Sequence, residues 1–232
     1  AVGDITGICV GTSGSIATRR NAVEGLGELG DKRAVEPIIG LLNDEAEVVH
    51  TAVFWLGQLK DERVVEPLIE LLKKEDKTPN QQIRGQIGST LKIFESAIDP
   101  LIELLIHQDY GIRINAVRAL GRYHNKQTVG PLIDLLKIES KLPSPEYSIF
   151  AIFDIIESLE EIYDDLAIEP LIELLKHEDI NIPPVAAEAL MQFGNERAIE
   201  PLTELLTNQD LTYRRQVIVD ALESIKLENG KE

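Results

Sequence analysis

The chain has 232 residues, 44% of them hydrophobic, and its 23 Lys and Arg face 40 Asp and Glu, for a formal net charge of −17. Phosphate backbones bind through clustered cations, so this balance disfavours nucleic acid as a partner. No apolar run suggests membrane insertion, no signal-peptide pattern opens the chain, and the single Cys9 excludes an intrachain disulfide, so we expect a cytoplasmic protein.

Residues 1–18 differ from the rest of the chain. Gly3, Gly7, Gly11 and Gly14 make this stretch a poor helix. We therefore expect an irregular N-terminal segment, either a frayed terminus or a tail that binds a partner. Residues 19–232 are expected to form one domain, because a repeat runs through them.

The repeat is marked by a proline inside an apolar motif such as Ala34-Val35-Glu36-Pro37-Ile38-Ile39. Six copies occur, at residues 34–39, 64–69, 97–102, 128–133, 167–172 and 198–203, and their prolines step by 30, 33, 31, 39 and 31 residues. Proline lacks an N–H and fits only the first turn of a helix. The motif therefore predicts helices near residues 34–43, 64–74, 97–107, 128–139, 167–177 and 198–207.

A second motif, rich in small residues, precedes the proline helices. Its clearest copies are residues 22–27, 52–57, 116–121 and 186–191, and a Gly after Leu, as in Leu26-Gly27, is typical. A Gly inside a helix costs about 1 kcal/mol relative to Ala, so we expect these glycines to allow close backbone contact. The motif predicts helices near residues 19–29, 46–59, 80–94, 110–123, 146–162, 181–193 and 211–226. The 39-residue step between the prolines of the fourth and fifth copies contains Pro143 and Pro145, which predict a protruding loop.

The two motifs, joined by a turn such as Gly30-Asp31-Lys32-Arg33, resemble the HEAT-like repeat of the phycobilisome-lyase (E–Z) type over residues 19–227. The resemblance implies an all-α fold, a right-handed alpha-alpha superhelix of about 13 helices arranged in antiparallel pairs. It also implies that the small-residue helices line the concave face and the proline helices the convex face.

No constellation of residues predicts catalysis, a cofactor or a metal. A HEAT-like hydroxylase family binds iron through repeated His-Glu pairs, but this chain has only His177-Glu178. Repeat alignment places His107 and His177 alike at the end of a proline helix, where a cation favours the helix dipole. Cys9 has no His near it in sequence, so we expect an incidental thiol rather than a nucleophile.

The expected concave face is the candidate binding site. Aligning the small-residue helices brings one exposed position of each into a row, consisting of Glu24, Phe54, Ser89, Arg118, Glu157, Glu188 and Asp220. Tyr110 and Arg113 join it from a preceding turn, since exposed Tyr and Arg are typical interface anchors. Phe54 and Trp55 are adjacent and cannot face the same way on a helix. Trp55 aligns with Ala119 and Ala189, so it is expected between helices and Phe54 at the surface.

Two function classes follow. The first is a non-catalytic scaffold or adaptor that binds a protein partner through the concave face, because solenoids present long surfaces of this kind. The second, implied only by the resemblance, is a bilin lyase subunit or a chaperone that handles phycobiliproteins. Covalent uptake of a bilin on co-expression with a phycobiliprotein would distinguish the second from the first.

Overall fold

The computed structural model describes residues 14–74, 81–142, 146–207 and 215–230. These residues form thirteen α-helices and six short 3₁₀ helices, and no strand occurs among them. The all-α fold predicted from the repeat is therefore confirmed. The chain divides between Tyr123 and His124 into two compact units, here the N-terminal and C-terminal units, which are described separately.

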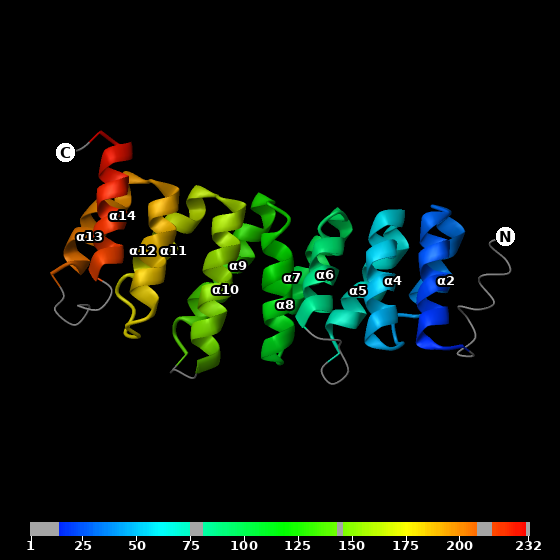
Figure 1. The fold of residues 1–232 in the computed structure, drawn as a ribbon. Helices are drawn as coiled ribbons and strands as arrows, with labels where there is room; N and C mark the ends of the chain where they lie inside the picture. Colours follow the sequence, from blue (N-terminus) through cyan, green and yellow to red (C-terminus); the bar gives the residue numbers. More distant parts are fainter. Residues whose placement is uncertain (1–13, 75–80, 143–145, 208–214, 231–232) are drawn as a thin grey trace. The chain divides into compact units, whose positions relative to one another are not determined.

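The N-terminal unit has two layers of helices. Its helices are α2 (Ile16–Glu28), α3 (Val35–Ile39), α4 (Ala46–Leu59), α5 (Val65–Leu72), α6 (Gln81–Leu91), α7 (Ile98–Leu104) and α8 (Tyr110–Gly121). The small-residue helices α2, α4, α6 and α8 pack side by side as a first layer (Figure 1). The proline helices α3, α5 and α7 each pack against the first-layer helix that follows and form the second layer.

The C-terminal unit repeats this arrangement. Its helices are α9 (Val129–Glu139), α10 (Glu146–Ile162), α11 (Ile168–Leu174), α12 (Ile182–Phe193), α13 (Ile199–Leu205) and α14 (Arg215–Glu228). Here α12 lies between α10 and α14 in the first layer, and α9, α11 and α13 form the second layer (Figure 1). In both units the core lies between the layers, where residues such as Leu56 and Leu190 are fully buried.

A repeated turn joins each first-layer helix except α6 to the proline helix after it; after α6, Phe94 stands at the capping position and makes no side-chain cap. A left-handed residue such as Gly30 (φ 63°) or Lys60 (φ 47°) ends or follows the first-layer helix. An Asp or Asn then accepts the backbone N–H two residues on, as Asp31 does from Arg33 at 2.9 Å, and a 3₁₀ turn leads into the helix. This side-chain acceptor replaces the missing helical partner of that N–H. Proline then falls in the first turn, as predicted.

The glycines that follow Leu in the motif at positions 27 and 57 meet side chains of the next helix; at position 57 a Cβ would lie 3.0 Å from Cγ2 of Thr90. A close backbone contact occurs instead at Gly88, which does not follow Leu in the motif: a Cβ there would lie 3.3 Å from the Cα of Ala119, so the contact expected of the Leu-Gly positions is not found at Gly27 or Gly57. At Gly27 the space is filled by a side chain instead, because the same Cβ would lie 2.1 Å from Cδ2 of Trp55. The indole of Trp55 therefore packs on α2, between helices as the alignment predicts.

Two expectations need correction. His107 and His177 do occupy equivalent places after a proline helix, but each Nδ1 accepts a backbone N–H, from Asp109 and Asp179 respectively, at 3.0 Å. An accepting nitrogen carries no proton, so the rings act as neutral caps and the predicted cationic role is wrong. The first helix starts at Ile16 rather than at residue 19.

Some expectations concern residues beyond the described ranges. These are most of the N-terminal segment, the loop around Pro143 and Pro145, and the first residues of the last helix. No helix among the described residues is long and apolar enough to cross a membrane.

Candidate protein-binding faces

The residues of the aligned row that belong to the N-terminal unit are accessible on consecutive first-layer helices. Phe54 is 46% exposed, whereas Val53 and Leu56 beside it are fully buried. Ser89 is exposed, and Glu24 and Arg118 are half-buried. The phenyl ring of Phe54 meets the indole of Trp55 edge to face, with ring centroids 5.2 Å apart. The expected exposure of Phe54 is confirmed, and its role in binding remains a prediction.

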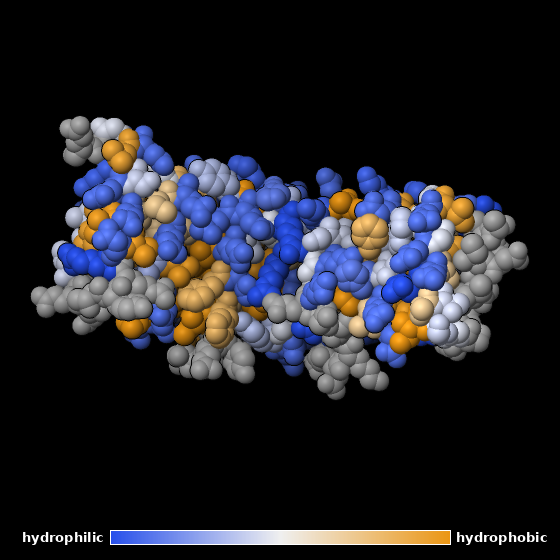
Figure 2. Space-filling model, in the orientation of Figure 1, coloured by the Kyte–Doolittle hydropathy of each residue, from blue (hydrophilic) through white to orange (hydrophobic). Residues whose placement is uncertain are grey.

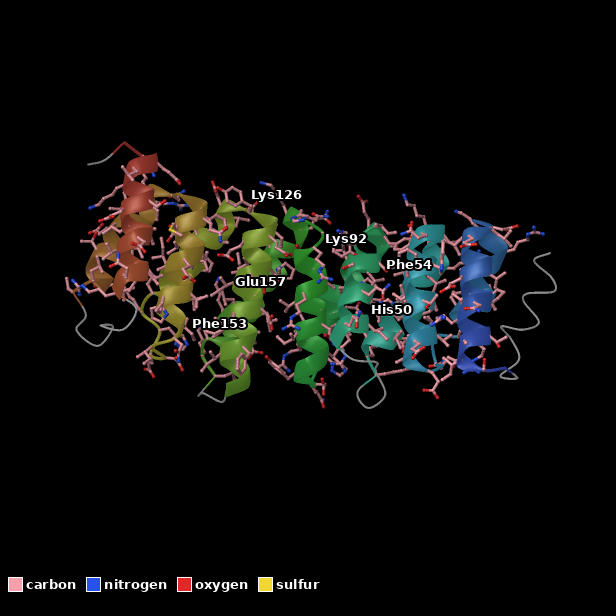
Figure 3. The ribbon with its side chains drawn as sticks, viewed as in Figure 1. His50, Phe54, Lys92, Lys126, Phe153 and Glu157 are labelled. Atoms are coloured by element: carbon pink, nitrogen blue, oxygen red, sulfur yellow. The ribbon has the colours of Figure 1, made fainter. Side chains whose placement is uncertain are left out.

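A hollow of about 570 Å³ opens at the surface of the N-terminal unit, where α2, α4 and α6 meet. Its lining includes Arg20 and Glu24 of α2, Glu47 and His50 of α4, and Ile83 of α6. The guanidinium of Arg20 lies 3.7 Å from the carboxylate of Glu24 and 3.8 Å from that of Glu47. Phe54 does not line the hollow, but it lies one turn after His50 on α4 (Figure 3).

Both charge signs therefore meet at this hollow, and an exposed aromatic side chain lies one turn away on α4. Such a surface can accept hydrogen bonds from a partner and donate them to it, and it can also cover an apolar side chain. The pairs that Arg20 makes are partly exposed, so each contributes little to folding stability and can be exchanged for contacts with a partner.

Three residues near the ends of α6 and α8 make contacts within the protein. The Arg122 guanidinium donates to Oγ of Ser89 at 2.7 Å and to the Gly85 carbonyl, which ties α8 to α6. Arg113 donates to the carbonyls of His107 and Gln108 at 3.0 and 3.1 Å, and its guanidinium lies 5.7 Å from the ring centre of Tyr110. The structure therefore gives Ser89 and Arg113 a part in holding the fold, which the sequence did not indicate.

The C-terminal unit carries the rest of the aligned row on α10, α12 and α14. Glu157, Glu188 and Asp220 are all exposed, and Asp220 accepts a hydrogen bond from Nε2 of Gln216 at 2.7 Å. One turn before Glu157, Phe153 is half-buried on the same side of α10 (Figure 3). Phe150, one turn earlier again, is 58% exposed.

Glu160 lies behind this row, half-buried at the position that Gly27 occupies in α2. Burial raises the pKa of its carboxyl from 4.5 to about 7, with smaller contributions from the charges of Glu157 and Glu188. Both causes disfavour the ionised form. The acidic residues of α10 and α12 are therefore close enough to repel one another.

Comparison with known families identifies the repeat. A model described as HEAT repeats matches residues 10–86 and 153–223, which together exceed half of the chain. The chain belongs to the HEAT-repeat family. No curated protein matches this HEAT-repeat chain. Among the part of the chain that the structure describes, no group of three or more His, Cys, Asp or Glu is placed to hold a metal ion.

Several solved structures are similar to the HEAT-repeat chain at low identity. An engineered protein is 20% identical, with 96% of this chain and 68% of that chain covered and a TM-score of 0.49. A chain from the complex of CpcE and CpcF of phycocyanin lyase from a Nostoc species is 19% identical, with 97% and 94% covered and a TM-score of 0.45. Human deoxyhypusine hydroxylase is 16% identical, with 100% and 96% covered and a TM-score of 0.45. These similarities do not specify a function.

Sequence alignment of the HEAT repeats missed the two phenylalanines of α10. The alignment compared one position per helix, and Glu157 fills that position in α10. A helix presents i, i+3 and i+7 on one face, so the spacing of Phe150, Phe153 and Glu157 was the available signal. This spacing alone does not show that the two phenylalanines are exposed, because the buried face of α10 has the same period and is equally apolar.

Proposed function

We propose that the protein is a non-catalytic scaffold or adaptor and that a protein partner binds the exposed face of its first-layer helices. The resemblance to HEAT-like repeats implies that this face is the concave side. The observation that supports the proposal most directly is Phe54, a large apolar side chain that is 46% exposed and lies one turn after His50, a residue that lines the hollow. Exposed aromatic residues are common interface anchors.

The surroundings of Phe54 support an interface. The hollow on the same helices offers cationic, anionic and neutral groups. An apolar anchor with a polar rim is the usual composition of a protein–protein interface. Arg118, half-buried on α8, is the cation that the repeat alignment places in the same row.

Site-specific photo-crosslinking tests the proposal. Phe54 is replaced by p-benzoylphenylalanine, which keeps an aromatic ring at that position, and the protein is exposed to extract from its own source. We expect a discrete crosslinked protein. Ile106 is the matched control, because it is an 80% exposed apolar residue that follows the second-layer helix α7 in the same unit. The same analogue at position 106 should not capture the protein that crosslinks to position 54.

Substitutions then measure the contribution of each anchor to the captured partner. Phe54→Ala and Arg118→Ala should each weaken binding by about tenfold or more and leave the melting temperature almost unchanged. Normal binding by both variants, or equal capture from position 106, would refute the assignment of this face. Transfer of a bilin to a captured phycobiliprotein would instead indicate a lyase subunit.

A further inference from the structure

The exposed face of α10 and α12 in the C-terminal unit is divided into an apolar and an acidic half. Phe150 and Phe153 lie in the first half of α10, and Val185 is half-buried in the first turn of α12. Figure 2 shows apolar atoms gathered over this part of α10, with hydrophilic atoms above them. A phenylalanine that is 58% exposed leaves most of its ring in water, which is unfavourable unless a partner covers it.

The second half of the same face is acidic. Glu157 and Glu161 of α10 and Glu188 of α12 are exposed, and Glu160 lies half-buried among them. Neither α10 nor α12 contains any Lys, Arg or His. The neighbouring α14 adds Asp220 and Glu223, and its cations are Arg215, which donates to the Leu206 carbonyl at 2.7 Å, and Lys226 in the last turn. Among the described residues of α10, α12 and α14, the negative charges of this face therefore outnumber the cations.

The neighbouring carboxylates contribute to the raised pKa of Glu160. The pKa of its carboxyl is raised to about 7 by burial and also by the charges of Glu157 and Glu188 on two different helices. A cation placed over α10 and α12 would reduce this repulsion, since an opposite charge nearby favours the ionised carboxylate. The apolar half and the acidic half thus require complementary groups from one partner.

We propose that this face binds a basic amphipathic segment of the protein partner, with its apolar side chains on Phe150 and Phe153 and its Lys or Arg side chains on Glu157 and Glu188. The assignment rests on the proposed scaffold function and specifies the chemistry of the partner. Packed helices lie about 8–10 Å apart, so a segment that crosses α10, α12 and the neighbouring α14 spans about 20 Å. That length is about 14 residues of α-helix.

A designed peptide tests the proposal on the whole protein. The probe is a fluorescent peptide of about 14 residues that contains only Leu and Lys, with Leu on one helical face. The comparison peptide has the same residues in an order that does not separate them. Fluorescence anisotropy should show the amphipathic peptide binding about tenfold or more tightly than the comparison peptide, because only the former matches both halves of the face.

Variants locate the binding. Phe150→Ala and Phe153→Ala should each weaken the amphipathic peptide by about tenfold, and Glu188→Gln by a few-fold with a shallower dependence on salt. Ile138→Ala, a 51% exposed apolar residue on α9, and Glu173→Gln, exposed on α11, are matched controls from the second layer that should leave binding unchanged. Unchanged helical circular dichroism confirms that each variant is folded.

Three results would overturn the proposal. Equal affinity for both peptides, or equal losses in the control variants, would show only diffuse attraction to an acidic protein. A dimer in sedimentation that dissociates in Phe150→Ala would make a second copy of the chain the occupant. If the amphipathic peptide does not bind but a partner crosslinks at position 54, only the proposal of a basic segment is refuted. If the peptide does not bind and no partner crosslinks, the scaffold function is refuted as well.

Discussion

Replacing Gly27 by alanine should destabilise the N-terminal unit, although the same change elsewhere in α2 should stabilise it. The new Cβ would lie 2.1, 2.3 and 2.4 Å from three ring atoms of Trp55, so the indole must move. Overpacking of this kind costs about 1–3 kcal/mol. Alanine recovers about 1 kcal/mol of helix propensity. Because the overlap is severe, we expect a net loss of about 1–2 kcal/mol.

Gly25→Ala is the matched control, in the same helix and with the same propensity gain. Nothing lies within 4 Å of the Cβ at this position, so the variant should gain about 0.5–1 kcal/mol. Trp55 is the single tryptophan of the chain and lies at the contact, so its fluorescence during urea unfolding reports on this unit. The two variants should differ by about 2 kcal/mol and shift the transition in opposite directions.

A second background shows whether the indole is the cause. Trp55→Ala introduces the residue that α8 and α12 carry at the aligned position, Ala119 and Ala189. In that background, followed by circular dichroism, Gly27→Ala should become neutral or stabilising, because the obstructing ring is gone. If Gly27→Ala stabilises the otherwise unchanged protein as much as Gly25→Ala does, the packing of Trp55 on α2 is refuted.

Three further predictions concern charge, hydrogen bonding and metals. The pKa of Glu160 is raised in the folded state to about 7, so the free-energy cost of ionising its carboxyl is absent below pH 4.5 and complete above pH 7. Glu160→Gln should therefore raise the free energy of unfolding by about 1 kcal/mol at pH 8, after allowance for partial exposure. At pH 4 the same substitution should change the denaturation curve very little. The Tyr123 hydroxyl donates to the carbonyls of Leu91 and Phe94 at 2.6 and 3.1 Å, so Tyr123→Phe should cost about 1 kcal/mol, and an unchanged unfolding midpoint would contradict these bonds. Chelators should leave the melting temperature unchanged, and stoichiometric zinc or iron lost together with stability would be contrary to this expectation.

The sequence alone determined the helices of this protein and their order. A proline must lie in the first turn, and the motif Ala34-Val35-Glu36-Pro37 repeats, so local geometry was sufficient to place helix starts. Exposure of Phe54 and packing of Trp55 between helices also followed, because adjacent residues of a helix face different ways. These inferences depend on residues within a few turns of one another, where the backbone period relates sequence to space.

Only the tertiary structure decided the features that depend on distances between helices. The contact of Gly27 with an indole from α4, the neutral capping role of His177 and the raised pKa of Glu160 each require coordinates from separate segments. The same holds for the division of the chain after Tyr123 and for the exposure of Phe150. A helical period shows which residues share a face, but packing determines which face is covered, since burial is a property of the neighbours.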